Sequence, residues 1–151
     1  MENNIDLNQE ISFKTFKKQV LEDYRLIVTS REASLLGRRE VLTGKAKFGI
    51  FGDGKELPQI ALSKVFKKGD YRSGYYRDQT FMMAINELTV KQLFSGLYAN
   101  TDIDEEPMSA GRQMGAHFNT PFLNKDGSWK NLVDFKNSSS DISCTGSQMP
   151  R

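Results

Sequence analysis

A long helical pattern, from about Thr15 to Lys45, limits the choice of fold more than any other part of the sequence. Gly37 lies inside this pattern, where a glycine costs roughly 1 kcal/mol relative to alanine, so it predicts either a break or close packing. Gly44 is a suitable residue to end the helix. The pattern rests on apolar residues that recur at helical spacings with charges between them: Phe16, Val20, Tyr24, Ile27, Val28, Leu35, Leu36 and Leu42.

Two further helical patterns follow this first one. Glu56 opens a short amphipathic segment, and a longer pattern runs from Gln79 to about Ala99. Asp78 is expected to be the N-cap residue of the longer helix, and Thr89 marks a bend. We expect much of that helix to be buried, because its apolar residues cover a large part of its surface: Phe81, Met82, Ile85, Leu88, Leu93, Phe94 and Leu97.

Composition limits the classes of function. The chain has 151 residues, 38% of them hydrophobic and 26% charged, which is typical of one soluble globular domain. A net charge of +2 is too small to indicate nucleic-acid binding, and no apolar run is long enough to span a bilayer. One cysteine, Cys144, and one histidine, His117, argue against a disulfide within the chain and against a His/Cys metal site. The polar start predicts no signal peptide, and a reducing, cytoplasmic location fits best.

The stretch Tyr71–Gln79 combines tyrosines and arginines in a β-prone run that turns into a helical pattern. Tyr75, Tyr76 and Arg77 are therefore expected at the end of a strand, next to the first N–H groups of a helix. Those N–H groups and the positive end of the helix dipole favour an anion, and the guanidinium of Arg77 can reach the same place. An ordinary surface ion pair of Arg77 is an equal alternative.

Two other motifs are less specific. Gly52-Asp53-Gly54 is similar to the opening of a magnesium-binding motif, but the asparagine that such a motif requires is missing, because Asn86 falls inside a helical pattern. We therefore favour a loop that leads into the helix at Glu56. Gly111-Arg112-Gln113, followed by His117, is consistent with an ordinary loop, since a lone histidine more often serves only in hydrogen bonding.

Taken in order, four motifs make a more specific signal. They are Gly54-Lys55-Glu56, then Tyr75-Tyr76-Arg77-Asp78, then Gly111-Arg112-Gln113-Met114 with His117, and finally Ser143 to Pro150. From about Tyr24 to Arg151 the chain resembles the alpha subunit of the thiamine diphosphate-dependent decarboxylating component of 2-oxo acid dehydrogenase complexes. The resemblance is closest to the branched-chain 2-oxoisovalerate type.

The resemblance implies a role for several residues. Tyr76 and Arg77 would bind the cofactor diphosphate, which agrees with the preference of guanidinium groups for phosphate oxygens. His117 would line the entrance of the active site and is the catalytic candidate. Ser143 and Thr145 would approach the aminopyrimidine ring of the cofactor.

A potassium site is also implied. The carbonyl of Ile142 and the side chains of Ser147 and Gln148 would face the ion through oxygen atoms. Two positions depart from the family pattern, because Cys144 and Gly115 stand where related chains often carry proline.

Family members decarboxylate a 2-oxo acid on the thiazolium ring of thiamine diphosphate and pass the acyl group to the lipoyl arm of a partner acyltransferase. Their active site lies between an alpha part and a beta part, and the beta part is either a partner subunit or a fused domain. The Mg²⁺ motif follows Gln148-Met149-Pro150 in the family, so its ligands are expected outside this sequence. We expect neither nucleic acid nor membrane as a partner.

The expected fold is an α/β one, an N-terminal fragment of a thiamine diphosphate-binding fold, helix-rich with one or two short parallel strands. Residues 1–14 would be a flexible N-terminus, and residues 15–151 a partial domain truncated before the magnesium motif. Such a fragment would bind the cofactor poorly, have no turnover alone, and expose apolar faces where the rest of the enzyme packs.

Two alternatives stay open. The first keeps the enzyme class but makes the substrate pyruvate or acetoin, because no residue of the chain sets the size of the substrate side chain. The second is a non-catalytic helical interaction module, in which Arg77 and Arg112 serve only as docking charges.

Overall fold

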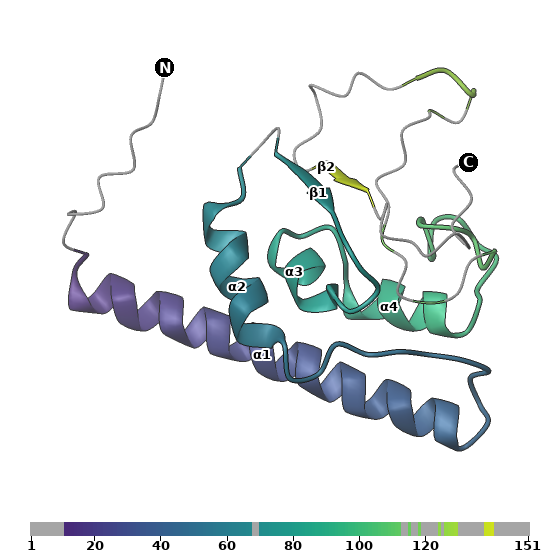
Figure 1. The fold of residues 1–151 in the computed structure, drawn as a ribbon, viewed down its shortest axis with the longest axis horizontal. Helices are drawn as coiled ribbons and strands as arrows, with labels where there is room; N and C mark the ends of the chain where they lie inside the picture. Colours follow the sequence, from purple (N-terminus) through teal and green to yellow (C-terminus); the bar gives the residue numbers. More distant parts are fainter. Residues whose placement is uncertain are drawn as a thin grey trace.

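The computed structural model describes residues 11–67, 70–112, 115, 118, 124, 126–129 and 138–140. The elements, in chain order, are α1 (Phe13–Leu42), α2 (Glu56–Val65), β1 (Tyr71–Ser73), α3 (Gln79–Ala84), α4 (Val90–Leu97) and β2 (Ser138–Ser140). The long helix α1 runs along one side of the molecule, and α2, α3 and α4 pack against it (Figure 1). The expectation of a helix-rich chain is confirmed. No helix in this described part is both long and apolar enough to cross a membrane.

Helix α1 is continuous over 30 residues. It begins after Ser12, whose hydroxyl oxygen accepts the backbone N–H of Thr15 at 3.2 Å, and this cap makes the helix start inside the segment expected to be flexible. The helix ends near Gly44, which has a φ of 77° and whose N–H donates to the carbonyl of Val41. The remainder of the predicted flexible start, residues 1–10, lies outside the described residues.

The buried face of α1 is made of small residues: Ser30, Ala33, Ser34 and Gly37. Of the two alternatives that Gly37 predicted, a break in the helix or close packing, the structure shows close packing. A Cβ atom at this position would lie 2.3 Å from Cε1 of Phe51, so any side chain here would force the Phe51 ring to shift. The large apolar residues of the helical pattern lie mostly on the outside, with exposed fractions of 62% for Tyr24 and 81% for Leu42. The apolar pattern therefore marks a helix correctly but not its buried side.

The single helix predicted from Gln79 to Ala99 is wrong, because the chain forms two helices there, α3 and α4. Asn86 adopts a left-handed conformation with a φ of 62°, which ends α3. Thr89 then starts α4 with a capping box: its side chain accepts the N–H of Gln92, and the Gln92 side chain accepts the N–H of Thr89. The predicted bend near Thr89 is in fact a helix start.

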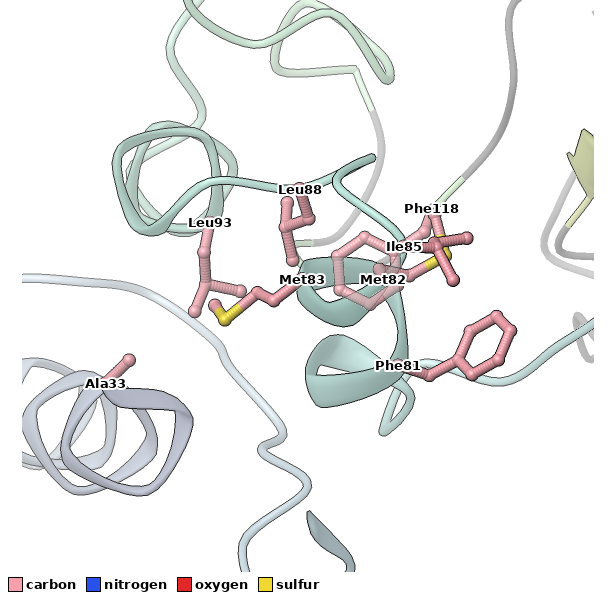
Figure 2. Packing of buried hydrophobic residues seen from close by; sticks show 8 residues of the cluster. All are labelled: Ala33, Phe81, Met82, Met83, Ile85, Leu88, Leu93 and Phe118. Atoms are coloured by element: carbon pink, nitrogen blue, oxygen red, sulfur yellow. The ribbon is translucent and has the colours of Figure 1, made fainter. Parts of the chain in front are cut away.

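The hydrophobic core centres on α3 (Figure 2). Phe81 and Met82 are each 1% exposed, so the expectation that they are buried is confirmed, and the neighbouring Met83 is 7% exposed. Side chains from α1, α4 and the segment near residue 118 complete the cluster, which comprises Ala33, Phe81, Met82, Met83, Ile85, Leu88, Leu93 and Phe118. Phe66 extends the core after α2, with its ring edge against Phe81 at a centroid distance of 5.1 Å.

The two short strands pair in parallel, with Tyr71 opposite Ser138, Arg72 opposite Ser139 and Ser73 opposite Ser140. Arg72 connects β1 to α3, since its Cζ atom lies 6.0 Å from the centroid of the Phe81 ring. The helices α3 and α4 come between the two strands in the sequence, as the long connection of a parallel pair requires. The pairing brings a segment from the C-terminal, serine-rich part of the chain next to the strand that leads into Tyr75–Arg77.

Candidate functional site

Tyr75, Tyr76 and Arg77 form a compact cluster in the turn between β1 and α3, and we call these three residues the clamp. The two tyrosine rings lie against each other with a centroid distance of 3.8 Å, and the Tyr75 hydroxyl donates to the Tyr76 hydroxyl. The Cζ atom of Arg77 lies 5.0 Å from the centroid of the Tyr75 ring and 5.3 Å from that of Tyr76. These distances allow the guanidinium to interact with both ring systems, which holds it in place.

The clamp presents hydrogen-bond donors. The hydrogen bond that the Tyr75 and Tyr76 hydroxyls share, together with burial, raises the pKa of Tyr76, so this phenol is protonated at neutral pH. Among the described residues the buried Nε atom of Arg77 has no hydrogen-bond partner, and none of the ion pairs there includes Arg77. A guanidinium beside phenol hydroxyl groups is complementary to an anion with several oxygen acceptors.

The backbone of the clamp is fixed by α2 and by the loop before it. The side chain of Gln59 donates to the carbonyl of Arg77 at 2.9 Å and accepts the N–H of Phe81, also at 2.9 Å. Gly52 packs directly against the same carbonyl, since a Cβ atom there would lie 2.2 Å from the Arg77 oxygen. The glycine-rich loop at residues 52–54 therefore supports the clamp by close approach of two backbones.

The expected contribution of a helix N-terminus is not what the structure supports. Helix α3 has only six residues, and Gln59 already binds one of its first N–H groups. Asp78 stands at the N-cap position but makes no capping hydrogen bond. Its Oδ2 instead accepts from Nη1 of Arg72 at 2.6 Å and from the N–H of Tyr75 at 2.8 Å. The side chains of the clamp, not the helix end, are therefore the candidate for anion binding among the described residues.

An ion pair between the buried carboxylate of Glu56 and the partly exposed Arg31 anchors the loop before α2. Glu56 is 4% exposed, and its carboxylate accepts two hydrogen bonds from Arg31, at 2.6 Å and 2.9 Å, as well as the N–H of Gly54. The hydrogen bonds and charge of Arg31 lower the pKa of Glu56 to about 2. Asp53, in the loop itself, pairs with Arg38 at 2.6 Å. Among the described residues no group of three or more His, Cys, Asp or Glu side chains is placed to hold a metal ion.

A second buried carboxylate shapes the loop that contains Arg112. Glu106 is 3% exposed and accepts the N–H groups of Met108, Ser109 and Gly111. Arg112 is itself exposed, and its Nε donates to the carbonyl of Ser109 at 3.0 Å. The Gly-Arg-Gln motif is therefore held by Glu106 at its start.

Of the predicted site residues, the structure describes Tyr76 and Arg77, and it brings them together with Tyr75. The other predicted residues lie outside the described residues: His117, Ile142, Ser143, Thr145, Ser147 and Gln148. Two supporting residues, Gln59 and Arg72, were missed by sequence reasoning. A polar residue in an amphipathic helix gives no sign of burial, and the only hint for Arg72 is the glycine two residues after it.

Comparisons of this chain with protein-family models, with curated proteins and with solved structures found no match.

Proposed function

We propose that this chain is the alpha part of a thiamine diphosphate-dependent enzyme that decarboxylates a 2-oxo acid, with the clamp as its diphosphate-binding element. The proposal takes the ordered motifs of the sequence and the geometry of the clamp together. The fold that it implies is an α/β thiamine diphosphate-binding fold, to which the described helices and the parallel strand pair would contribute one part.

The observation that carries this proposal is the environment of Arg77. Its Nε atom is buried and has no hydrogen-bond partner in the described part of the chain, while Gln59 binds its carbonyl and the Tyr75 ring lies against its guanidinium. Leaving a buried donor of a charged group unpaired is unfavourable, and an anionic ligand removes that cost. A structural ion pair, the alternative open from the sequence, has no support among the described residues, because no carboxylate there pairs with Arg77.

Thiamine diphosphate fits the residues that are present. The guanidinium of Arg77 can donate hydrogen bonds to two oxygens of one phosphate, and the protonated phenol of Tyr76 can donate to another oxygen. When bound, the cofactor supplies the ring that stabilises the carbanion formed in decarboxylation of a 2-oxo acid. The contribution of this chain is to bind the charged end of the cofactor and to keep it in one orientation.

The parallel strand pair also supports the proposal. Strand β2 ends at Ser140, two positions before Ile142 in the sequence, and it lies beside the strand that leads into the clamp. The proposed aminopyrimidine contacts, Ser143 and Thr145, and the proposed potassium ligands, Ile142, Ser147 and Gln148, therefore follow a strand that is fixed next to β1. Ligands of α/β proteins are commonly bound where such strands end.

The decisive experiment replaces Arg77 with alanine in the complete protein that carries this chain, together with the beta part that the proposal implies. We expect the thiamine diphosphate concentration for half-maximal turnover to rise at least about tenfold, because a charge-assisted hydrogen bond to phosphate is lost. Arg25→Ala is the matched control, since it removes the same charge from an exposed position on α1. Equal cofactor requirements for both variants would contradict the proposal.

The substrate is proposed to be a branched-chain 2-oxo acid such as 2-oxoisovalerate, with acyl transfer to a lipoyl-bearing acyltransferase. Pyruvate or acetoin is the alternative substrate. Turnover by the complete protein on a panel of branched and unbranched 2-oxo acids and acetoin separates these substrates. A preference for pyruvate or acetoin would overturn the branched-chain assignment but not the cofactor site.

A helical interaction module is the second candidate function, and the outer face of α1 favours it. Large apolar side chains are exposed there at helical spacing: Phe13 79%, Val20 46%, Tyr24 62%, Val28 38%, Leu35 43% and Leu42 81%. Under the first proposal this face would pack against the rest of the enzyme. If the module is correct instead, Arg77→Ala leaves cofactor dependence unchanged, while Tyr24→Ser weakens association with a partner.

A further inference from the structure

Arg72, in the middle of β1, is a buried charged residue whose guanidinium reaches two separate parts of the chain. Its exposed fraction is 7%. Nη1 donates to Oδ2 of Asp78 at 2.6 Å, and Nη2 donates to the backbone carbonyl of Phe118 at 3.3 Å. A guanidinium makes such a bridge because its N–H groups point in fixed directions, whereas the ammonium of a lysine is a single point of charge.

The Asp78 end of this bridge closes the turn that contains the clamp. The same Oδ2 atom accepts the N–H of Tyr75 at 2.8 Å, and the N–H of Asp78 donates to the carbonyl of Tyr75 at 3.0 Å. Tyr76 and Arg77 lie between these two bonded residues. The position of the clamp relative to β1 therefore depends on the hydrogen bond from Arg72 to Asp78.

The other contacts of Arg72 lead to parts of the chain that are distant in sequence. Phe118 belongs to the hydrophobic core, is 2% exposed, and directly follows His117 in the sequence. The backbone of Arg72 lies opposite Ser139 in the parallel pair of strands. Arg72 thus connects the turn of the clamp, the segment at Phe118 and strand β2.

The space for this guanidinium depends on Gly74. A Cβ atom at residue 74 would lie 1.2 Å from Nη1 of Arg72 and 1.9 Å from its Cζ atom. Any other residue there would force the guanidinium away from Asp78. The glycine in the middle of the Tyr-Arg stretch is explained by the room that it leaves for a buried arginine.

We propose that Arg72 is a positioning residue for diphosphate binding: it fixes Tyr76 and Arg77 relative to Phe118 and β2. The inference rests on the proposed function, because it concerns the same anion site. Arg72 acts through Asp78 and the turn, and its own donors are used within the protein. Its loss should therefore change where the clamp lies while leaving the side chains of the clamp intact.

The test uses Arg72→Lys, which keeps the buried positive charge but removes the fork. Binding of thiamine diphosphate and of thiamine monophosphate to the complete protein is measured by titration calorimetry in the presence of magnesium. We expect the affinity for the diphosphate to fall about tenfold, the effect of one lost charge-assisted hydrogen bond. The preference for diphosphate over monophosphate should fall with it, because a displaced Arg77 reaches the second phosphate less well. Asp78→Asn tests the same bridge from its other end and should give the same change.

Leu93→Ala is the control for a general loss of stability, because it removes a core side chain from α4. It is expected to leave the ratio of the two affinities unchanged. An unchanged ratio in both Arg72→Lys and Asp78→Asn overturns the positioning role while the proposed function stands. If the unsubstituted protein binds the diphosphate no better than the monophosphate, the proposed function fails, and this inference fails with it.

Discussion

In most helices of globular proteins the large apolar side chains lie on the inner face, but in α1 most of them lie on the outer face. The inner face packs on α3 and on the loop at Phe51, and its fully buried residues are all small: Ser30, Ala33, Ser34 and Gly37. One larger side chain on α1, Leu26, is partly buried against the core. The outer face carries exposed tyrosine, phenylalanine, leucine and valine side chains. An amphipathic helix usually buries its large apolar side.

The inner face holds its neighbours by close approach and by hydrogen bonds. Nε2 of Gln79 donates to the carbonyl and hydroxyl of Ser30 and to the hydroxyl of Ser34, while the hydroxyls of Ser30 and Thr80 lie 2.6 Å apart. Large side chains on this face would push α3 away and move the clamp that precedes it. The apolar outer face is left free to pack on another protein surface.

The largest effect is expected where a bulky residue enters the inner face. Ser34 is fully buried, so Ser34→Leu overpacks the contact with α3 and removes one partner of Gln79. We expect the unfolding free energy to fall by about 3 kcal/mol, the sum of a moderate overpacking and a lost buried hydrogen bond. Leu35→Ser, one residue along on the outer face, should change it by less than about 0.5 kcal/mol. Urea denaturation followed by circular dichroism measures both, and equal losses would remove the distinction between the two faces.

A smaller loss of stability is expected at acidic pH. It concerns Arg31, a charged residue on the outer face of α1, which forms an ion pair with Glu56. The pKa of Glu56 is lowered from 4.5 to about 2 in the folded chain. Its contribution is therefore fully present above pH 4.5 and is lost as the pH falls toward 2. We expect this loss to be on the order of 2 kcal/mol, because the partner is partly exposed.

Glu56→Gln should remove most of the stability change between these pH values, as measured by urea denaturation at a series of pH values. Glu22→Gln is the control, because Glu22 is exposed and makes only a 3.8 Å pair with Lys18. A pH dependence that Glu56→Gln leaves intact would show that the ion pair does not stabilise the loop.

The smallest effect is expected for a single methyl group. Gly37→Ala gains about 1 kcal/mol in helix propensity, but its Cβ would meet the ring of Phe51 at 2.3 Å, so we expect a net loss of about 1 kcal/mol. Gly96→Ala in α4 is the matched control: its nearest heavy atom lies 3.8 Å away, and the substitution should stabilise the chain. Thermal unfolding of the two variants, with shifts of opposite sign, checks this expectation. A stabilised Gly37→Ala would mean that Phe51 moves aside easily.

Much of the helical content was predictable from local signals. The start of α2 at Glu56 and the end of α1 near Gly44 follow from the periodicity of apolar residues and the terminating glycine. The break at Asn86 was not predictable, because the apolar periodicity runs on through this position and does not mark a left-handed residue. The spacing of the apolar residues also predicts an apolar stripe along α1, but it does not show which side of the helix is buried.

Of the candidate site, only the residues of the clamp were predictable from the sequence, and the residues that support them were not. Tyr76 and Arg77 stand in a recognisable order with an acidic residue and a helix behind them. Gln59 and Arg72, which hold the clamp, are a polar and a charged residue that sequence reasoning assigns to the surface. Their burial depends on partners that are far away in the chain, namely the carbonyls of Arg77 and Phe118.

The parallel pairing of β1 with β2 has a consequence for the order of folding. The strands are separated by α3, α4 and the chain through Phe118, so the entropy of closing this long loop opposes their pairing until other contacts have formed. The contacts of α1 with α2 and α3 close shorter loops, with a separation of 25 residues between Arg31 and Glu56 and of 49 between Ser30 and Gln79, so these helices can assemble earlier. We therefore expect the helical layer to form first during synthesis and the strand pair to close last, as the step that completes the surroundings of the clamp.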